Sequence, residues 1–168
     1  MRAPLLALLS LALAAPVSAA TAPRIPITSF EQLAMPLPLP YDEQANARAV
    51  VAAAKARAKA HHKLLLIDLG GNWCLDCRLL AGTMDLPALR KFLDAHYEVV
   101  TVDAGRFDKN LDIPAHYGIT QRMEGVPSVL IVDPRTDRLL NPGHTAALAD
   151  ARSMSPQALA DWLASWTK

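Results

Sequence analysis

The sequence has little excess charge of either sign, since 17 Lys and Arg residues oppose 16 Asp and Glu residues for a formal net charge of +1. It also contains no dense run of Lys and Arg, so nucleic acid is not its expected partner. No internal repeat is present, and a composition of 52% hydrophobic and 20% charged residues disfavours extended disorder and fibrous structure. A chain of 168 residues with this composition is expected to form one globular domain without disulfide staples.

An apolar run long enough to span a membrane is absent. The run at the start, residues 5–15, has 11 residues, short of the roughly 20 that a spanning helix needs. It follows Arg2 and leads to the small residues at 17–19, which suit signal peptidase. We interpret residues 1–19 as a secretory signal peptide, with an uncleaved anchor as the alternative. Cleavage would leave a periplasmic or secreted protein, and no Cys follows the run to carry a lipid.

Regular structure is not expected in residues 20–40, which are rich in proline. Because proline fixes φ and lacks an N–H donor, this segment suits neither a helix nor a central strand. It is predicted to be an extended arm or linker, polyproline-like over residues 35–40. Packing on the domain, a simple tether and a docking site for a partner are the alternatives.

The rest of the chain, residues 41–168, is expected to form an α/β domain. Asp42 is predicted to cap its first helix, and the continuous apolar run at residues 64–69 predicts a strand covered on both faces. Strands joined by a helical crossover should be parallel and the later hairpin antiparallel, which gives a mixed central sheet flanked by helices. Helices are expected at residues 42–60, 74–80, 86–96, 113–117 and 157–166, and strands at 64–69, 98–103, 128–132 and 138–140.

Only two cysteines are present, Cys74 and Cys77, spaced as Cys-x-x-Cys where the buried strand gives way to a helix. Their loop is too short for a useful structural staple, and the second ligand pair of a structural zinc site is absent. Redox chemistry fits this placement, because a helix N-terminus lowers a thiol pKa below its usual value of about 8.5. Cys74 is predicted to be the nucleophile, and Cys77 the cysteine that resolves the mixed disulfide.

These residues amount to a family resemblance. Residues 67–77, with Tyr117-Gly118-Ile119 and Gly125-Val126-Pro127-Ser128, resemble the thioredoxin superfamily, and the predicted secretion points to its periplasmic members. The Trp-Cys-x-Asp-Cys form is also similar to a small thioredoxin-related group with Trp-Cys-Pro-Asp-Cys. The resemblance covers residues 63 to about 168 and implies a thioredoxin-like fold and thiol–disulfide oxidoreductase activity.

The resemblance also implies roles for four residues around the cysteines. Asp68 matches the buried acid that helps to accept the proton of Cys77, and apolar neighbours should raise its pKa. Trp73 matches the aromatic residue that shields the site. Pro127 matches a cis-proline which, with Val126, leaves backbone free to bind a substrate strand. The plainer alternatives are an exposed Asp68, a core-filling Trp73 and a trans Pro127.

Several positions depart from the usual thioredoxin pattern. Leu75-Asp76 replaces the common Gly-Pro, and the charge of Asp76 should oppose a very low pKa of Cys74, a redox-tuning effect. Helix-start stabilisation is the alternative role for Asp76. Gly70 stands where many thioredoxins have tryptophan, and residues 120–124 and 143–155 form longer loops, so a general thioredoxin role is in doubt.

The expected function is therefore exchange of the Cys74–Cys77 dithiol/disulfide with cysteines of other proteins in the periplasm, as a reductant. Such a reductant needs an electron donor, expected to be a membrane thiol-reductase. We expect a monomer with no metal site and no cofactor beyond its redox-active disulfide. The alternative is a protein that binds or delivers Cu(I), because thiolates favour soft metals. A redox-inactive interaction module is disfavoured, since both cysteines are present.

Overall fold

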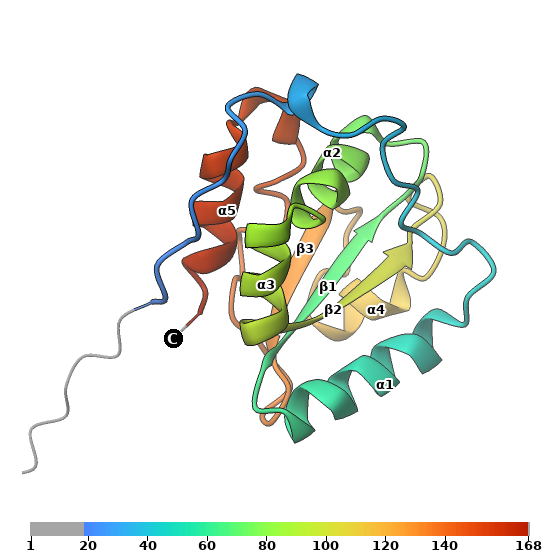
Figure 1. Cartoon of the computed structure of the whole chain (residues 1–168). Helices are drawn as coiled ribbons and strands as arrows, with labels where there is room; N and C mark the ends of the chain where they lie inside the picture. The colour runs from blue at the N-terminus through green and yellow to red at the C-terminus, as the bar shows by residue number, and fades with distance from the viewer. Residues whose placement is uncertain (1–18, 168) are drawn as a thin grey trace, which may run out of the picture.

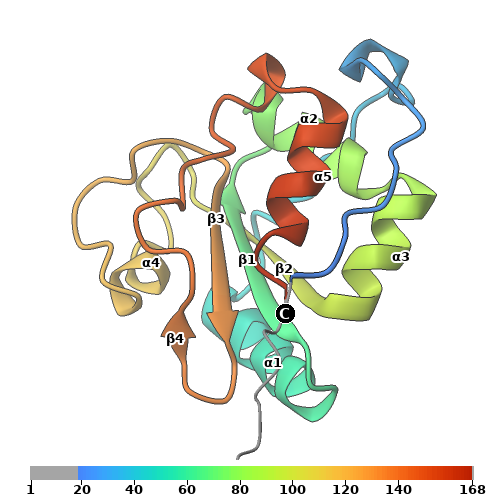
Figure 2. The ribbon, with the colours of Figure 1, turned by 90° about the vertical axis from the view of Figure 1, so that its left-hand side faces the viewer.

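A mixed sheet forms the centre of the fold. The computed structural model describes residues 19–167, and its sheet has four strands in the order β2-β1-β3-β4 (Figures 1 and 2). β1 (Leu64–Gly70) pairs in parallel with β2 (Tyr97–Asp103) and antiparallel with β3 (Ser128–Asp133), which pairs antiparallel with the short β4 (Arg138–Leu139). The mixed sheet and the parallel pair predicted from the sequence are confirmed.

Helices cover both faces of this sheet, which confirms the predicted α/β class. α1 and α4 lie on one face, whereas α2, α3 and α5 lie on the other, as Figures 1 and 2 show from two directions. The helices are α1 (Ala47–Ala60), α2 (Leu75–Met84), α3 (Pro87–His96), α4 (Asp112–His116) and α5 (Pro156–Ala164). None of these described helices has the length and apolar character needed to cross a membrane. The signal peptide predicted for residues 1–19 lies outside the described residues, apart from Ala19.

The central strand β1 is buried on both faces, as its uninterrupted apolar run predicted. Leu65, Ile67 and Leu69 belong to the core cluster beneath α1, whereas Leu66 belongs to the cluster beneath α3 and α5. All four side chains are fully buried, and each such burial stabilises the fold by roughly 1.5–3 kcal/mol. The strand is therefore held firmly along its length, which fixes the position of the residues that follow its end.

The first helix begins later than the sequence predicted. The Oδ1 of Asn46 caps α1 by accepting a hydrogen bond from the Ala49 N–H at 3.1 Å. Asp42 is not the cap, because its carboxylate accepts a hydrogen bond from the Gln44 N–H at 2.9 Å and closes a local turn. Val50 of α1 is half-buried. The buried residues of α1 are Ala47, Val51, Ala54 and Ala58.

The proline-rich residues 19–40 pack against the domain, so the plain-packing alternative describes them. Ile25 joins the core cluster beneath α3 and α5. Leu33 and Leu37 form a smaller cluster with Leu79 of α2. The extended path is interrupted by one turn of 3-10 helix, η1 (Phe30–Gln32), which the sequence did not predict. Figure 1 shows this arm passing over α5 and α2 before it reaches α1.

The long connection over residues 143–155 also packs on the domain. The Asn141 side chain accepts a hydrogen bond from the Ile131 N–H at 2.9 Å and donates one to the Val129 carbonyl at 2.8 Å. The Val129 N–H donates to the Thr145 carbonyl at 2.8 Å. This connection therefore continues the pairing of β3 beyond the end of β4. It then forms a second 3-10 turn, η2 (Ala151–Ser153), against the start of α2.

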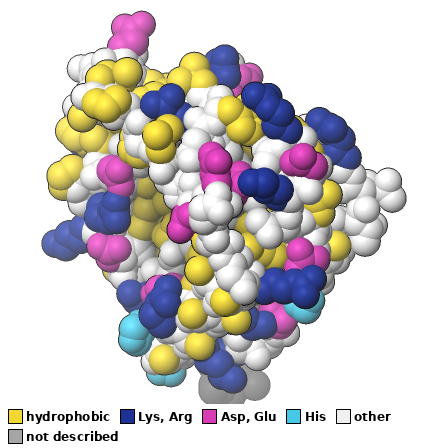
Figure 3. Space-filling view, turned by 90° about the vertical axis from the view of Figure 1, so that its right-hand side faces the viewer, with side chains coloured by type: hydrophobic (Ala, Val, Ile, Leu, Met, Phe, Trp, Pro, Cys, Tyr) yellow, Lys and Arg dark blue, Asp and Glu magenta, His cyan; other side chains and the backbone are white. Residues whose placement is uncertain are grey.

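Charge is mixed on the surface of the domain. Figure 3, which views the molecule from the right-hand side of Figure 1, shows Lys and Arg interspersed with Asp and Glu. A face of this kind produces no strong field of one sign. The near-neutral net charge of the sequence is thus accompanied by a mixture of both signs of charge on this face.

Candidate active site

The two cysteines lie where β1 ends and α2 begins. Cys74 is the N-cap of α2, and its Sγ accepts a hydrogen bond from the Cys77 N–H at 3.1 Å. The two residues are paired as a disulfide, with their Cα atoms 5.3 Å apart. Cys74 is 5% exposed and Cys77 is fully buried. Cys74 is therefore the sulfur nearer the surface, as its predicted attacking role requires.

Trp73 forms the outer rim of the site. Its side chain is 46% exposed, so the core-filling alternative is wrong. Its Nε1–H donates to the Gly105 carbonyl at 2.8 Å, which holds the indole across the loop after β2. The ring of Phe107 lies 6.4 Å away, and the guanidinium of Arg106 lies 4.9 Å from the indole centroid. The indole is thus fixed beside Cys74 with much of its surface still free.

The backbone at Val126 and Pro127 borders the disulfide. The peptide bond between these residues is cis, as the resemblance implied, so the trans alternative is wrong. The Val126 carbonyl oxygen lies 3.4 Å from Cys74 Sγ. Backbone next to the outer sulfur is therefore in place for a substrate segment, although the binding role itself stays a prediction.

The longer loop at residues 120–124 folds onto the same side of the domain. Met123 is 4% exposed and belongs to the core cluster that also contains Cys74 and Val126. The guanidinium of Arg122 lies 4.2 Å from the centroid of the Phe107 ring. The loop is thus anchored by one buried side chain and contributes exposed residues beside the Trp73 rim.

Asp68 lies on β1, six residues before Cys74, and is almost completely buried. Its side chain is 1% exposed, so the exposed alternative is wrong. Tyr41 Oη donates to the carboxylate, at 3.0 Å from each oxygen. Burial raises the pKa of Asp68 to about 7, and the hydrogen bond from Tyr41 acts in the opposite direction. The raised pKa expected from the apolar surroundings is confirmed, and it suits a base that works near neutrality.

Tyr41 is a residue that the sequence reasoning did not connect with the site. A Cβ added to Gly70 would lie within 3.0 Å of both Tyr41 Oη and Cys77 Sγ. Glycine is therefore needed at this position to leave space for the tyrosine hydroxyl. The departure at Gly70 was visible in the sequence and was the available signal that another large side chain fills that space.

Asp76 is not a free charge beside the thiolate. The Arg152 guanidinium reaches both carboxylate oxygens, with Nε 3.0 Å from Oδ1 and Nη2 2.6 Å from Oδ2, and the Arg152 backbone N–H donates to Oδ1 at 2.9 Å. Burial acts to raise the pKa of Asp76, but the hydrogen bonds and charge of Arg152 outweigh it and hold the pKa below its usual range. Asp76 thus also ties the start of α2 to η2, a contact that the sequence reasoning missed.

A family model described as thioredoxin-like matches residues 46–134, which is more than half of the chain. The chain belongs to the thioredoxin-like family. With the fold and the Cys74–Cys77 disulfide described above, this makes it a thioredoxin-like thiol–disulfide oxidoreductase, as the sequence resemblance implied.

One of the solved structures similar to this chain matches it over about three quarters of its length. A disulphide isomerase from Xylella fastidiosa Temecula1 is 38% identical, with a TM-score of 0.70, over 76% of this chain and 96% of that chain. The DsbH oxidoreductase is 19% identical, with a TM-score of 0.41, over 67% of this chain and 94% of that chain. No curated protein matches the chain at a significant level.

Metal-ligating side chains do not gather in the described part of this thioredoxin-like domain. Within residues 19–167, no group of three or more His, Cys, Asp or Glu side chains is arranged to hold a metal ion.

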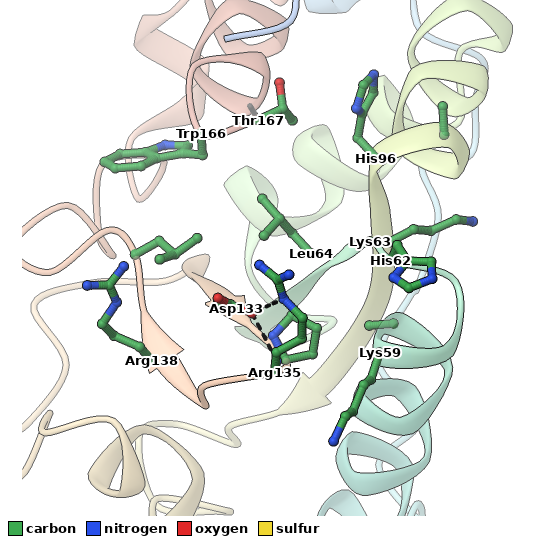
Figure 4. Close-up of a pocket in the computed structure, with 14 residues that line it drawn as sticks. Lys59, His62, Lys63, Leu64, His96, Asp133, Arg135, Arg138, Trp166 and Thr167 are labelled. Carbon is green, nitrogen blue, oxygen red and sulfur yellow. Dashed lines mark hydrogen bonds and ion pairs between the residues drawn. The ribbon is translucent and has the colours of Figure 1, made fainter. Parts of the chain in front are cut away.

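A separate cavity lies at the opposite end of β1 from the disulfide. It encloses about 280 Å³ and is bordered by Leu64, Asp133, Arg135 and Trp166. Figure 4 shows the ammonium groups of the neighbouring lysines directed away from it. No cysteine lines this cavity, so the redox chemistry of the thioredoxin-like domain belongs to the other end of the sheet.

Proposed function

We propose that this thioredoxin-like protein reduces disulfides of other proteins in the periplasm or outside the cell. The observation that carries the proposal is the position of Cys74. Its sulfur caps a helix at the domain surface beside the exposed Trp73 and the backbone of Val126. A peptide can approach along that backbone and bring its disulfide to the outer sulfur.

The reaction proceeds by two thiol–disulfide exchanges. The reduced Cys74 thiolate attacks a substrate disulfide, forms a mixed disulfide and releases one substrate sulfur as a thiolate. Cys77 then loses its proton to Asp68, and its thiolate attacks Cys74 Sγ. The Cys74–Cys77 bond forms, the second substrate sulfur leaves as a thiolate, and two electrons have moved to the substrate.

The direction of electron flow is inferred from the surroundings of Cys74. A strongly oxidising disulfide needs a strongly stabilised thiolate in the reduced state. Among the described residues, the hydrogen bond that reaches Cys74 Sγ comes from the Cys77 backbone N–H rather than from a cationic side chain. Asp76, two residues after Cys74, is paired with Arg152, and this pair largely cancels its own charge. Weak stabilisation of the thiolate favours the reducing direction.

The cellular setting is inferred from the predicted signal peptide at residues 1–19. An oxidising compartment does not regenerate a dithiol, so the protein needs a donor of thiol electrons, which we expect to be a membrane thiol-reductase. The disulfide is proposed to be the sole redox group, and a monomer suffices for the exchange.

Disulfide isomerisation is the second candidate, because the 38% identical Xylella relative is a disulphide isomerase. Both activities begin with attack by Cys74 on a protein disulfide. They differ in the outcome, since an isomerase returns the substrate to a new disulfide without net transfer of electrons.

The test is to trap substrates on Cys74 in the native host. Cys77→Ala removes the resolving thiol, so it should accumulate mixed disulfides that dithiothreitol dissolves, while the matched Cys74→Ala variant should accumulate few. Mass spectrometry identifies the trapped proteins, and their redox state before capture separates reduction from isomerisation. Absence of protein adducts on a folded Cys77→Ala variant with a free Cys74 thiol would reject the proposal. Tight binding of Cu(I) by the reduced protein, without insulin reduction, would instead favour the metal-delivery alternative.

A further inference from the structure

The residue directly after the arm, Tyr41, reaches the centre of the active site. Tyr41 is 2% exposed, and Asn72, just before the cysteines, binds its backbone twice. The Tyr41 N–H donates to Asn72 Oδ1 at 3.1 Å, and Asn72 Nδ2 donates to the Tyr41 carbonyl at 2.8 Å. The Thr101 hydroxyl donates to the Pro40 carbonyl at 2.8 Å. Arg78 of α2 donates to two further arm carbonyls at 2.9 and 3.1 Å.

Three reactive groups meet around Gly70. The Tyr41 hydroxyl lies 3.0 Å from both oxygens of Asp68. The same hydroxyl and Cys77 Sγ both lie within 3.0 Å of the point where a Cβ on Gly70 would stand. The Tyr41 hydroxyl therefore lies beside both the Asp68 carboxylate and the resolving sulfur, and it comes from the residue directly after the arm.

We propose that Tyr41 is a positioning residue for the resolving step, whose hydroxyl holds the Asp68 carboxylate in place and sets how readily it takes the Cys77 proton. This inference rests on the exchange chemistry of the proposed function. In the step itself the proton moves from Cys77 Sγ to Asp68, while Tyr41 keeps its own hydrogen. The Cys77 electron pair forms the bond to Cys74 Sγ, and the substrate sulfur leaves with the pair of the broken bond.

The hydrogen bond from Tyr41 shifts the pKa of Asp68 in a definite direction. Because the hydroxyl donates to the ionised carboxylate, it stabilises that form and acts to lower the pKa of Asp68 against the effect of burial. Removing the hydroxyl should raise the pKa of Asp68 above about 7. The carboxylate would then become available as a base only at higher pH.

Other titratable groups surround Asp68 at greater distance. A groove of about 420 Å³ is lined by Asp68 together with Pro38 and Pro40 of the arm. Burial and Tyr41 account for the shifted pKa of Asp68. Among the described residues, the elements packed around Asp68 also carry Cys77 on α2 and Asp103 on β2. The titratable or charged side chains along the groove are Lys63, Asp85, Arg90, Asp94, Tyr97 and Glu98.

The experiment compares Tyr41→Phe with Tyr97→Phe. Tyr97 is an equally buried tyrosine whose hydroxyl donates at 2.7 Å to the Leu163 carbonyl, so its loss controls for a missing buried hydrogen bond. The reduced protein, complete except for the predicted signal peptide, is mixed with Ellman's reagent. The first thionitrobenzoate released reports attack by Cys74, and the second reports resolution by Cys77.

We expect Tyr41→Phe to leave the first release unchanged and to move the pH midpoint of the second to higher pH. If the midpoint rises by one pH unit, the second release should be about tenfold slower than in wild type at pH values below the midpoint. Above pH 9 the two rates should differ little. Tyr97→Phe should keep the wild-type midpoint. An unchanged midpoint in Tyr41→Phe, or the same shift in both variants, would overturn the inference.

Two further measurements keep the test independent of folding and of the proposed function. Carbon-13 NMR of the aspartate carboxyls follows the pKa of Asp68 directly in wild type and variant. If Tyr41→Phe does not fold, Asn72→Ala, which releases the Tyr41 backbone and keeps the ring, should produce the same upward shift, and an unshifted midpoint there would overturn the inference. If the wild-type protein reacts with Ellman's reagent in two phases but Cys77→Ala traps no proteins in the host, the proposed function is rejected and the inference about Tyr41 stands.

Discussion

Asp76 illustrates how a neighbouring residue changes the effect of a charge. It follows Cys74 by two positions, and an isolated carboxylate there would oppose formation of the thiolate. Arg152 binds both of its oxygens, however, so the thiolate faces an ion pair rather than one negative charge. We therefore expect the tuning effect predicted from the sequence to be smaller, with the same sign.

Substitutions of the two partners should shift the pKa of Cys74 in opposite directions. Asp76→Asn should lower it and make the disulfide more oxidising, whereas Arg152→Gln should raise it because Asp76 is left unpaired. Each change should be small, because the exposed Arg152 side chain leaves the ion pair screened by solvent. Alkylation rates against pH and equilibration with glutathione measure both. A shift of the same sign in both variants would mean that the pair acts through the packing of η2.

The sequence predicted some site residues and missed others for a physical reason. Asp68 lies in a continuous apolar run, so its burial and its raised pKa followed from its immediate neighbours. Tyr41 and Arg152 act through hydrogen bonds to residues 27 and 76 positions away along the chain. Neither lies in a local pattern that specifies its partner, and only the folded arrangement brings them together.

At the scale of elements, the loop at residues 120–124 has a buried anchor and an exposed remainder. Met123 packs in the core, while Arg122 contacts the Phe107 ring beside the Trp73 rim. The loop is therefore fixed in place and able to influence which substrates approach Cys74.

Shortening residues 120–124 to one residue should change which proteins are trapped by Cys77→Ala, without abolishing insulin reduction. It should also lower stability, because the loss of a buried Met side chain costs about 2–5 kcal/mol. Met123→Ala, which keeps the loop length, is the matched control and should lose stability while trapping the same proteins. Identical adducts in the shortened variant would show that the loop does not select substrates.

Most helices and strands were predictable because each carries its own signal. The strands follow apolar runs, and the capping Ser155 followed by Pro156 is a local signal for the start of α5. The start of α1 was misplaced because Asp42 and Asn46 are both good capping residues, and the choice depends on the turn that Asp42 forms with Gln44. The η1 turn was missed because it is short and lies among prolines.

At the scale of the whole molecule, the buried Asp68 lowers the stability of the folded protein near neutral pH, where its carboxylate is proposed to act as a base. Its pKa is about 7 in the folded protein against an ordinary value of 3.8. The folded state therefore holds a proton that the unfolded state releases between these values, and stability falls as pH rises through that window. A difference of about three units corresponds to roughly 4 kcal/mol lost by pH 8 relative to pH 4.

Asp68→Asn should remove this loss and slow the reaction. Unfolding of the oxidised protein in urea should show a variant that gains stability over wild type as pH rises from 4 to 8, by up to roughly 4 kcal/mol. The same variant should resolve mixed disulfides slowly, because Cys77 has lost its base. Equal pH dependence of unfolding in the two proteins would contradict the raised pKa, and unchanged resolution from pH 6 to 8 would contradict the role as base.

The two ends of the described chain meet, and this sets an order on folding. The Ile25 N–H donates to Gln157 Oε1 at 2.9 Å, Gln157 Nε2 donates to the Pro23 carbonyl at 3.1 Å, and the Ala20 N–H donates to Thr167 Oγ1 at 3.1 Å. A chain that emerges from its N-terminus, from a ribosome or across a membrane, presents the start of the arm long before α5 exists. Residues 20–25 thus have to wait for partners that lie at the far end of the described chain.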